Sequence, residues 1–183
     1  MGYRTLPVTA FEQNCSIAWC DETRKAVIVD PGGDEERIIA AVESEVVEPV
    51  MVALTHGHLD HVGGTARIAR HFGVPVIGPH PDDRFWIEAL QQQVAMFGFP
   101  PVEDFMPDRW LQDGDSLDYG NQQLQVRLCP GHTPGHVSVV IRSAGAQAVI
   151  TGASMSCAFC RLLTGRATAR EASAMSMPAW IVG

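Results

Sequence analysis

Apolar residues in the first half of the chain fall into short runs that predict β-strands. Residues 25–30 (KAVIVD) and 49–55 (PVMVALT) are apolar runs rich in β-branched residues, which is typical of strands buried on both faces. Residues 3–10 and 14–20 predict two more strands around a turn, and residues 73–78 (GVPVIG) predict a short one. These runs therefore predict a sheet whose inner strands are covered on both sides.

Between these predicted strands the apolar residues recur at helical spacing. A helix is expected from the cap position Asp34, with acidic residues in its first turn and an apolar side behind them. A second helix is expected over about 65–72. A longer amphipathic helix is expected over 82–98, ended by Gly98 and the two prolines that follow it. Strands alternating with helices indicate α/β layers.

The pattern returns to strands in the second half of the chain. Residues 109–132 predict strands joined by glycine-bearing turns, and residues 136–142 and 147–152 predict two more. Because hairpins lie at both ends of the α/β part, the sheet is expected to be mixed. The predicted fold class is α/β.

The composition changes abruptly near residue 153. Of the 21 acidic residues only Glu171 lies beyond this point, and no histidine follows His136. We therefore expect a domain over residues 1–152, followed by a divergent tail over residues 153–183.

Charge and cysteine content exclude several classes of function. A net charge of −8 argues against a nucleic-acid partner and against attraction to an anionic membrane. No apolar run approaches the roughly 20 residues of a transmembrane helix, so a cytoplasmic location is expected. The five cysteines are an odd number in a chain without an evident secretion signal, and free thiols are the expected state.

Four residues with metal-binding side chains lie within six positions, directly after the predicted strand 49–55. In the segment THGHLDHVGG they are His56, His58, Asp60 and His61. Imidazole and carboxylate are ligands that zinc and related divalent ions prefer, and without a cation these groups would compete for the same protons. His132, in CPGHTPGH, also follows an apolar strand, where α/β sheets build their sites. Of the remaining histidines, His71 and His80 are expected to be polar surface or partly buried structural residues, and His136 is expected to support the ligands from behind or to be structural.

These two segments carry a resemblance to a known family. THGHLDHVGG matches the HxHxDH motif of the metallo-β-lactamase superfamily, and CPGHTPGH resembles its third-histidine segment. The similarity runs from residue 3 to about residue 152 and includes VDPGGD, FWIEAL and PDRWLQDGD. Together these segments resemble the short bacterial type II glyoxalases, which are hydroxyacylglutathione hydrolase-like proteins.

The resemblance implies a fold, a metal centre and a reaction. The fold would be an αββα sandwich with the metals at the edge between its sheets. His56, His58 and His132 would hold the first ion, and Asp60 and His61 the second, with Asp60 as the catalytic side chain that orients the hydroxide. Zinc is the expected cofactor, as one or two ions, and iron or manganese also suit these ligands. The implied reaction is hydrolysis of a small-molecule, glutathione-linked thioester such as S-lactoylglutathione by a metal-bound hydroxide.

The chain departs from the family pattern after residue 152. The family has an aspartate that bridges both metals where this chain has Ala153, and a final PGHG histidine has no counterpart. The sandwich is therefore expected to be C-terminally incomplete, with an unpaired sheet edge that would favour a homo-oligomer. Two explanations of the tail stay open: an out-of-frame or rearranged gene segment, or a divergent protein whose tail has another purpose.

Two functions follow from this mixture of matches and gaps. The first is the metal-dependent thioester hydrolase that the resemblance implies. The second is an inactive or weakly active metal-binding pseudoenzyme, or a truncated or frameshifted product. Two related functions are not expected. The persulfide dioxygenases of the family need the aspartate that is missing here, and a β-lactamase would need a secretion signal, which is not evident in this sequence.

Overall fold

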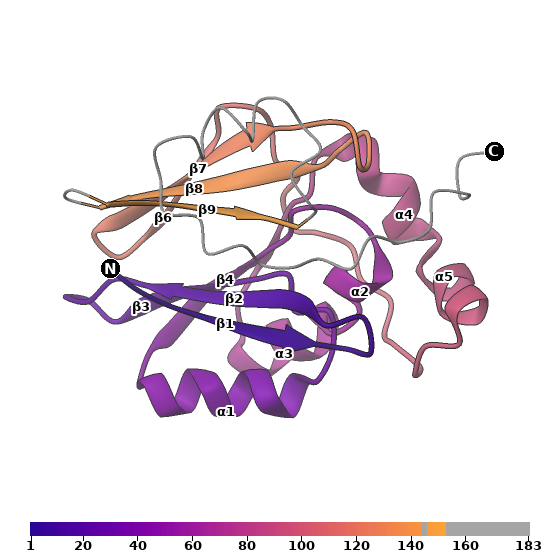
Figure 1. Ribbon diagram of the computed structural model, residues 1–183, viewed down its shortest axis with the longest axis horizontal. Helices are drawn as coiled ribbons and strands as arrows, with labels where there is room; N and C mark the ends of the chain where they lie inside the picture. Colours follow the sequence, from indigo (N-terminus) through magenta and orange to yellow (C-terminus); the bar gives the residue numbers. More distant parts are fainter. Residues whose placement is uncertain (144–145, 153–183) are drawn as a thin grey trace.

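The computed structural model describes residues 1–143 and 146–152, and its strands form two stacked sheets (Figure 1). The first sheet has the order β1-β2-β3-β4-β5, with strands Gly2–Val8, Gln13–Trp19, Lys25–Val29, Glu48–Ala53 and Val76–Ile77. The second has the order β6-β7-β8-β9, with strands Ser116–Tyr119, Gln122–Leu128, Val137–Ser143 and Ala146–Thr151. β3, β4 and β5 are parallel, whereas β1 and β2 are antiparallel to their neighbours. The predicted mixed α/β sheet is confirmed.

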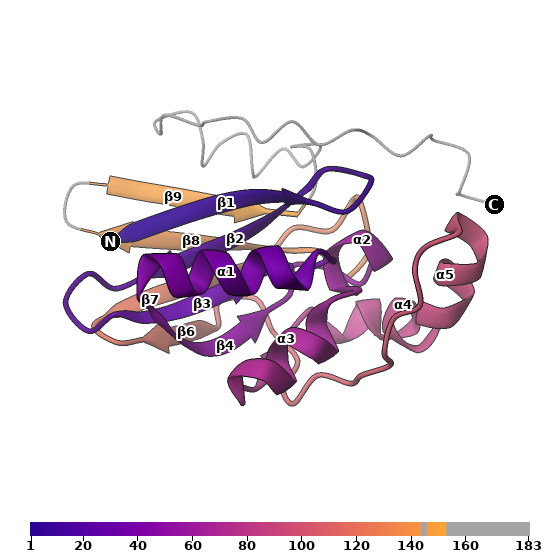
Figure 2. The same ribbon diagram turned by 90° about the horizontal axis from the view of Figure 1, so that it is seen from below.

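The helices cover one face and one end of this sandwich. They are α1 (Glu35–Glu45), α2 (Leu59–Val62), α3 (Thr65–Phe72), the 3-10 helix η1 (Pro81–Asp83), α4 (Arg84–Glu88) and α5 (Leu90–Phe97). α1 and α3 lie on the outer face of the first sheet, and α4 and α5 lie beyond one end of the strands (Figures 1 and 2). Within the described residues, no helix has the length and apolarity needed to span a bilayer.

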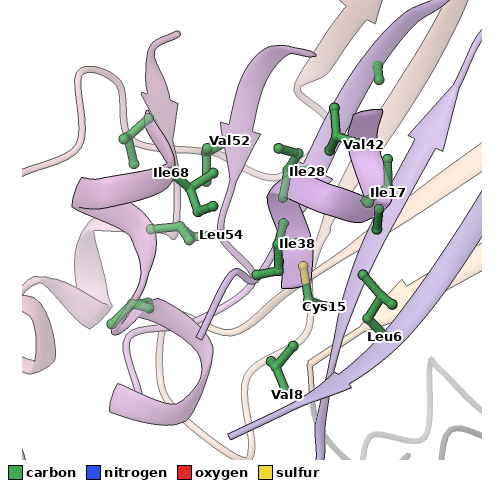
Figure 3. Close-up of a cluster of buried hydrophobic side chains, with 14 of the residues drawn as sticks. Leu6, Val8, Cys15, Ile17, Ile28, Ile38, Val42, Val52, Leu54 and Ile68 are labelled. Carbon is green, nitrogen blue, oxygen red and sulfur yellow. The ribbon is translucent and has the colours of Figure 1, made fainter. Parts of the chain in front are cut away.

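The first sheet has a hydrophobic core on each of its faces, which explains why its inner strands are continuous apolar runs. In β3, Ala26 and Ile28 belong to the core beneath the helices, whereas Val27 and Val29 belong to the core between the sheets. Successive side chains of a strand point to opposite faces, so a strand buried on both sides needs an apolar residue at every position. Figure 3 shows the core beneath the helices, where Ile38 of α1 lies beside Ile28.

The predicted helix over 82–98 is wrong as a single element. The chain there forms η1, α4 and α5 in succession, and α4 and α5 meet at Ala89, whose backbone angles (φ −93, ψ 17) are not helical. Ile87 of α4 and Leu90 of α5, on either side of the break, both belong to the core beneath the helices. The predicted end at Gly98 is confirmed, because Gly98 is the left-handed C-cap of α5.

Three layers of the expected αββα sandwich are formed by the described residues: helices α1 and α3, the first sheet and the second sheet. The described residues do not form a helical layer over the second sheet. The proposed tail, residues 153–183, lies outside the described residues, and so do Cys157 and Cys160. Of the cysteines within the described part, Cys15 and Cys20 are free thiols, as predicted, and both are buried.

Candidate metal centre

Three histidines from two sheets meet at one end of the sandwich. His56 and His58 follow β4 of the first sheet, and His132 lies between β7 and β8 of the second. The ring centroids of these three side chains are 4.7–4.8 Å apart. His56 is buried, His58 is half-buried and His132 is exposed, so the cluster reaches from the core to the surface. The structure therefore brings together the three residues that the sequence assigned to the first ion.

The separation of the imidazole nitrogens fits a shared cation. Nδ1 of His58 lies 3.1 Å from Nε2 of His132. Two nitrogens bound tetrahedrally at 2.0–2.1 Å from one zinc ion would be about 3.3 Å apart. The potential ligand atoms of His56, His58 and His132 all lie within 4.8 Å of one another.

Unpaired buried atoms show that the donor set fits a metal. Nε2 of His56 and Oδ1 of Asp60 are buried without a hydrogen-bond partner in the part of the chain that the structure describes. Leaving a buried polar atom without a partner costs free energy, about 1–3 kcal/mol for each. A divalent cation bound by these atoms would remove that cost.

A chain of hydrogen bonds behind His56 fixes the protonation of its ring. The Thr55 hydroxyl donates to Oδ2 of Asp30 over 2.6 Å and lies 3.0 Å from Nδ1 of His56. Because the hydroxyl proton is already directed at Asp30, the Thr55 oxygen accepts from His56 Nδ1–H. The lone pair of Nε2 is then free, as a metal ligand requires.

Asp30 orients His61 in the same way. Nδ1 of His61 donates to Oδ2 of Asp30 over 3.0 Å, which leaves Nε2 facing Oδ2 of Asp60 at 3.6 Å. Asp30 could itself complete a group with His56 and His61, but both of its oxygens already accept hydrogen bonds. The geometry therefore makes Asp30 a residue that orients histidines.

The two sets of histidines differ in their protonation. Burial and the neighbouring histidines lower the pKa of His56, and they lower the pKa of His58 to about 3. Burial would also lower the pKa of His61, but the hydrogen bond that His61 donates to Asp30 and the charges of Asp30 and Asp60 outweigh it and raise the pKa. His56 and His58 are therefore neutral at pH 7, which is the form that binds a metal.

His136 is a structural residue, as predicted. Its Nδ1 donates to the carbonyl of Cys129 over 3.2 Å, and its Nε2 lies 3.4 Å from Oγ1 of Thr151. Burial lowers the pKa of His136 to about 4. Its ring centroid is 5.4 Å from that of His56, so it packs behind the histidine cluster.

The last described residue, Gly152, lies against the same hydrogen-bond chain. A Cβ atom there would be 2.0 Å from Oγ1 of Thr55, 2.8 Å from Nδ1 of His56 and 2.9 Å from Oδ2 of Asp30. Only glycine fits at this close approach. Ala153, which stands where the family has its bridging aspartate, lies outside the described residues.

Two buried polar residues at the site escaped the sequence analysis. Asp83 accepts hydrogen bonds from Gly57 N, Thr133 Oγ1 and Gly135 N. Gln93 accepts from Leu59 N over 3.0 Å and donates to the carbonyls of Gly57 and Trp86. Both lie in the segment that was expected to be one amphipathic helix, where polar residues are assigned to the solvent face. The only feature of the sequence that could have indicated either residue is the position of the acidic Asp83 next to an apolar run.

Gly57 is required for packing more than for bending. A Cβ on Gly57 would lie 2.6 Å from Cβ of Trp86 and 3.1 Å from the Asp83 carbonyl oxygen. In the structure the missing side chain of Gly57 lets α4 approach, and the Trp86 ring contacts the His58 ring edge-on at 4.6 Å.

Comparison with known families and proteins gives a consistent result. Residues 8–152 match the family model described as the metallo-beta-lactamase superfamily. The chain is 43% identical over 141 residues to hydroxyacylglutathione hydrolase GloC of Haemophilus influenzae, covering 76% of this chain and 66% of that relative. It is 34% identical to a hydroxyacylglutathione hydrolase of Yersinia enterocolitica, covering 73% of this chain and 45% of that protein. The chain thus spans less than two thirds of the length of either relative.

Solved structures show the same likeness. BLEG-1 B3 metallo-beta-lactamase is 30% identical and superposes with a TM-score of 0.70, covering 80% of this chain and 70% of that one. TTHA1623, solved in a di-iron-bound form, is 29% identical with a TM-score of 0.66, covering 74% of this chain and 65% of that one.

Proposed function

Because the chain belongs to the metallo-β-lactamase superfamily, we propose that it is a metal-dependent hydrolase of glutathione-linked thioesters of the S-lactoylglutathione type. The observation that carries the proposal is the three-histidine cluster, in which Nδ1 of His58 and Nε2 of His132 are 3.1 Å apart. The named activity of two relatives supports the thioester as the substrate class. Hydrolysis would add water across the carbon–sulfur bond and release a carboxylic acid and glutathione as the free thiol.

His56, His58 and His132 would hold the first metal ion. A divalent metal there would lower the pKa of a coordinated water from 15.7 towards about 7 and polarise the thioester carbonyl. The exposed position of His132 leaves the cluster open to solvent and substrate on one side. Burial of His56, and its hydrogen bond to Thr55, would keep the inner ligand in one orientation.

Asp60 is the proposed catalytic side chain. It is buried, and its Oδ1 has no hydrogen-bond partner among the described residues. A carboxylate oxygen in this state can accept a hydrogen bond from the attacking water and hold its lone pair towards the substrate carbon. Asp60 and His61 are also the proposed ligands of a second ion, because Nε2 of His61 and Oδ2 of Asp60 face each other at 3.6 Å.

Zinc is the proposed metal, with iron as the nearest alternative. Three imidazoles and an open position make a catalytic zinc site in proteins. The di-iron-bound form of TTHA1623 supports iron, and manganese also suits nitrogen and oxygen ligands.

A metal-binding protein without hydrolase activity is the second candidate. The observation that favours it is the presence of alanine at position 153, because an alanine side chain cannot ligate a metal. The residue before it, Gly152, packs closely against Thr55 beside the histidine cluster. With only Asp60 and His61 proposed for the second ion, its binding would be weaker than that of the first.

The test combines metal content with turnover. The purified chain is loaded with zinc, its metal per chain is measured by mass spectrometry, and hydrolysis of S-lactoylglutathione is followed by the loss of thioester absorbance. Turnover with one or two zinc ions per chain supports the hydrolase. Stoichiometric zinc without turnover supports the second candidate, and no zinc binding contradicts both.

The variant H132A tests the cluster itself. Removing one of three ligands should lower kcat/KM and zinc affinity by more than about 100-fold, beyond the cost of outer-shell substitutions. H71A is the matched control, because His71 lies on α3 away from the cluster and should behave as the wild type.

A further inference from the structure

Asp83 connects the two loops that carry the histidine cluster. Its Oδ2 accepts hydrogen bonds from the backbone N–H of Gly57 over 3.0 Å and from the hydroxyl of Thr133 over 2.7 Å. Its Oδ1 accepts from the backbone N–H of Gly135 over 2.6 Å. The side chain is fully buried, so the described donors, not bulk water, satisfy it.

The donors are placed next to the proposed ligands. Gly57 lies between His56 and His58, in the loop that follows the first sheet's β4. Thr133 directly follows His132, in the loop between β7 and β8 of the second sheet. One carboxylate therefore fixes the backbone beside a ligand from each sheet.

The backbone of Gly135 packs tightly against Asp83. A Cβ on Gly135 would lie 2.6 Å from Asp83 N and 2.8 Å from Asp83 Oδ1. Gln93 holds the other side of the His58 segment, since it bonds to the Gly57 carbonyl and to the Leu59 N–H. The position of His58 is thus set from both sides by η1 and α5, and that of His132 by η1.

We propose that Asp83 is a positioning residue that holds His58 and His132 at the separation needed to bind one metal ion. This inference rests on the proposed metal-dependent function. Asp83 contacts neither ligand ring directly; it acts through the peptide N–H of Gly57 and through Thr133 and Gly135. A buried hydrogen bond to a charged group keeps two loops in one geometry more strongly than a neutral one.

The variant D83N keeps the size of the side chain and removes part of this function. An asparagine has one oxygen, so either orientation of its amide places an NH₂ group against a backbone N–H, of Gly57 or of Gly135. One loop is then released. Loss of an outer-shell partner typically costs 10–100-fold in metal affinity, and we expect a loss of about that size.

A second variant, T133V, removes only the hydroxyl donor beside His132. Asp83 keeps its two backbone donors, so we expect a smaller loss of metal affinity, about tenfold or less. D108N is the matched control. Asp108 also accepts a hydrogen bond from a backbone N–H, that of Val76 over 2.8 Å, but it contacts neither histidine loop.

The experiment measures binding of Co²⁺ to the full chain by competition with a coloured chelator, together with the visible spectrum of the bound ion. Intense visible absorption reports tetrahedral coordination, which overall stability alone would not change. Far-ultraviolet circular dichroism of the metal-free proteins verifies that each variant is folded. The inference expects weaker binding and an altered spectrum in D83N and T133V, and wild-type behaviour in D108N.

Each of the other outcomes decides for or against the inference. If the wild type and both variants bind Co²⁺ with the same affinity and spectrum, Asp83 does not position the ligands, and the proposed function is unaffected. If the wild type does not bind Co²⁺, the proposed function is wrong and this inference with it. If D83N fails to fold, T133V decides: unchanged affinity and spectrum overturn the inference, and a loss with an altered spectrum supports it.

Discussion

At the scale of single residues, the proposed metal centre consists of ligand side chains and of the buried residues that orient them. His56, His58 and His132 stand out because histidines cluster after predicted strands. Asp83 and Gln93 have no such context, since their partners are backbone groups and the Thr133 hydroxyl, up to 52 residues away. Hydrogen bonds of this kind depend on the tertiary fold, and a motif does not encode them.

Asp30 allows a test of orientation at this scale. It is buried, and it accepts hydrogen bonds from Thr55 N, Thr55 Oγ1 and His61 Nδ1. In the variant D30N an amide NH₂ would face at least one of these donors. We expect the free energy of unfolding of the metal-free protein to fall by about 1–3 kcal/mol, measured by urea unfolding with a chelator present.

The matched control for D30N is D34N. Asp30 and Asp34 share the same left-handed backbone conformation, with φ of 53° at each, and asparagine tolerates this conformation well. Asp34 lies at the surface, where its carboxylate accepts from Thr9 N and pairs with Arg37. Its substitution should cost no more than about 1 kcal/mol. Equal effects in the two variants would show that the buried contacts of Asp30 contribute nothing special.

At the scale of elements, the structure differs from the sequence predictions at helix ends and breaks. The helix expected from Asp34 is present as α1, but the Asp34 side chain makes no capping hydrogen bond and bonds to Thr9 and Arg37 instead. The predicted helix over 65–72 matches α3 at both ends. Helix existence follows from local periodicity, whereas caps and breaks depend on neighbours that the local pattern does not contain.

The C-terminal end of α1 has an unfavourable backbone conformation at Val46, which a substitution can relieve. Val46 is the C-cap residue, has φ 53° and is 76% exposed. A β-branched residue is unfavourable in the left-handed region, which glycine adopts freely. V46G should therefore raise the free energy of unfolding by about 1 kcal/mol, measured by urea unfolding.

Two further variants separate this explanation from a loss of surface apolar area. V46A removes the branched side chain but keeps Cβ, so it should recover only part of the stabilisation. E45G places glycine at the last residue of α1 and also removes the ion pair with Arg4, so it should destabilise by about 1 kcal/mol. A destabilised V46G would contradict the strained C-cap.

At the scale of the whole molecule, the two sheets bury several histidines together, which makes stability depend on pH. The pKa of His58 is lowered to about 3 and that of His136 to about 4, mainly by burial, and that of His56 is also lowered. In the unfolded chain these residues titrate near 6.5. Below that pH the unfolded state binds more protons than the folded state, so stability falls as the pH falls.

We therefore expect the metal-free protein to lose stability between pH 6.5 and about pH 4. The slope approaches about 1.4 kcal/mol per pH unit for each histidine that stays neutral in the folded state. The raised pKa of His61 makes its contribution to stability grow as the pH falls, but three histidines with lowered pKa values act against it. Thermal unfolding from pH 7.5 to pH 5 in the presence of a chelator measures the effect. A melting temperature that stays the same or rises as the pH is lowered would contradict it.

Added zinc should raise the melting temperature at pH 7.5, because it binds only the folded state.

The sequence by itself determined the α/β class, the strands buried on both faces, and the group of residues able to bind a metal. These features are local: a strand buried on both faces requires a continuous apolar run, and ligand-type residues cluster next to strand ends. Tertiary structure alone decided how His132 meets His58 across 74 positions of sequence, and which buried residues hold them there. Asp83, Gln93 and the close approach of Gly152 acquire their roles from surfaces that meet only when the two sheets pack.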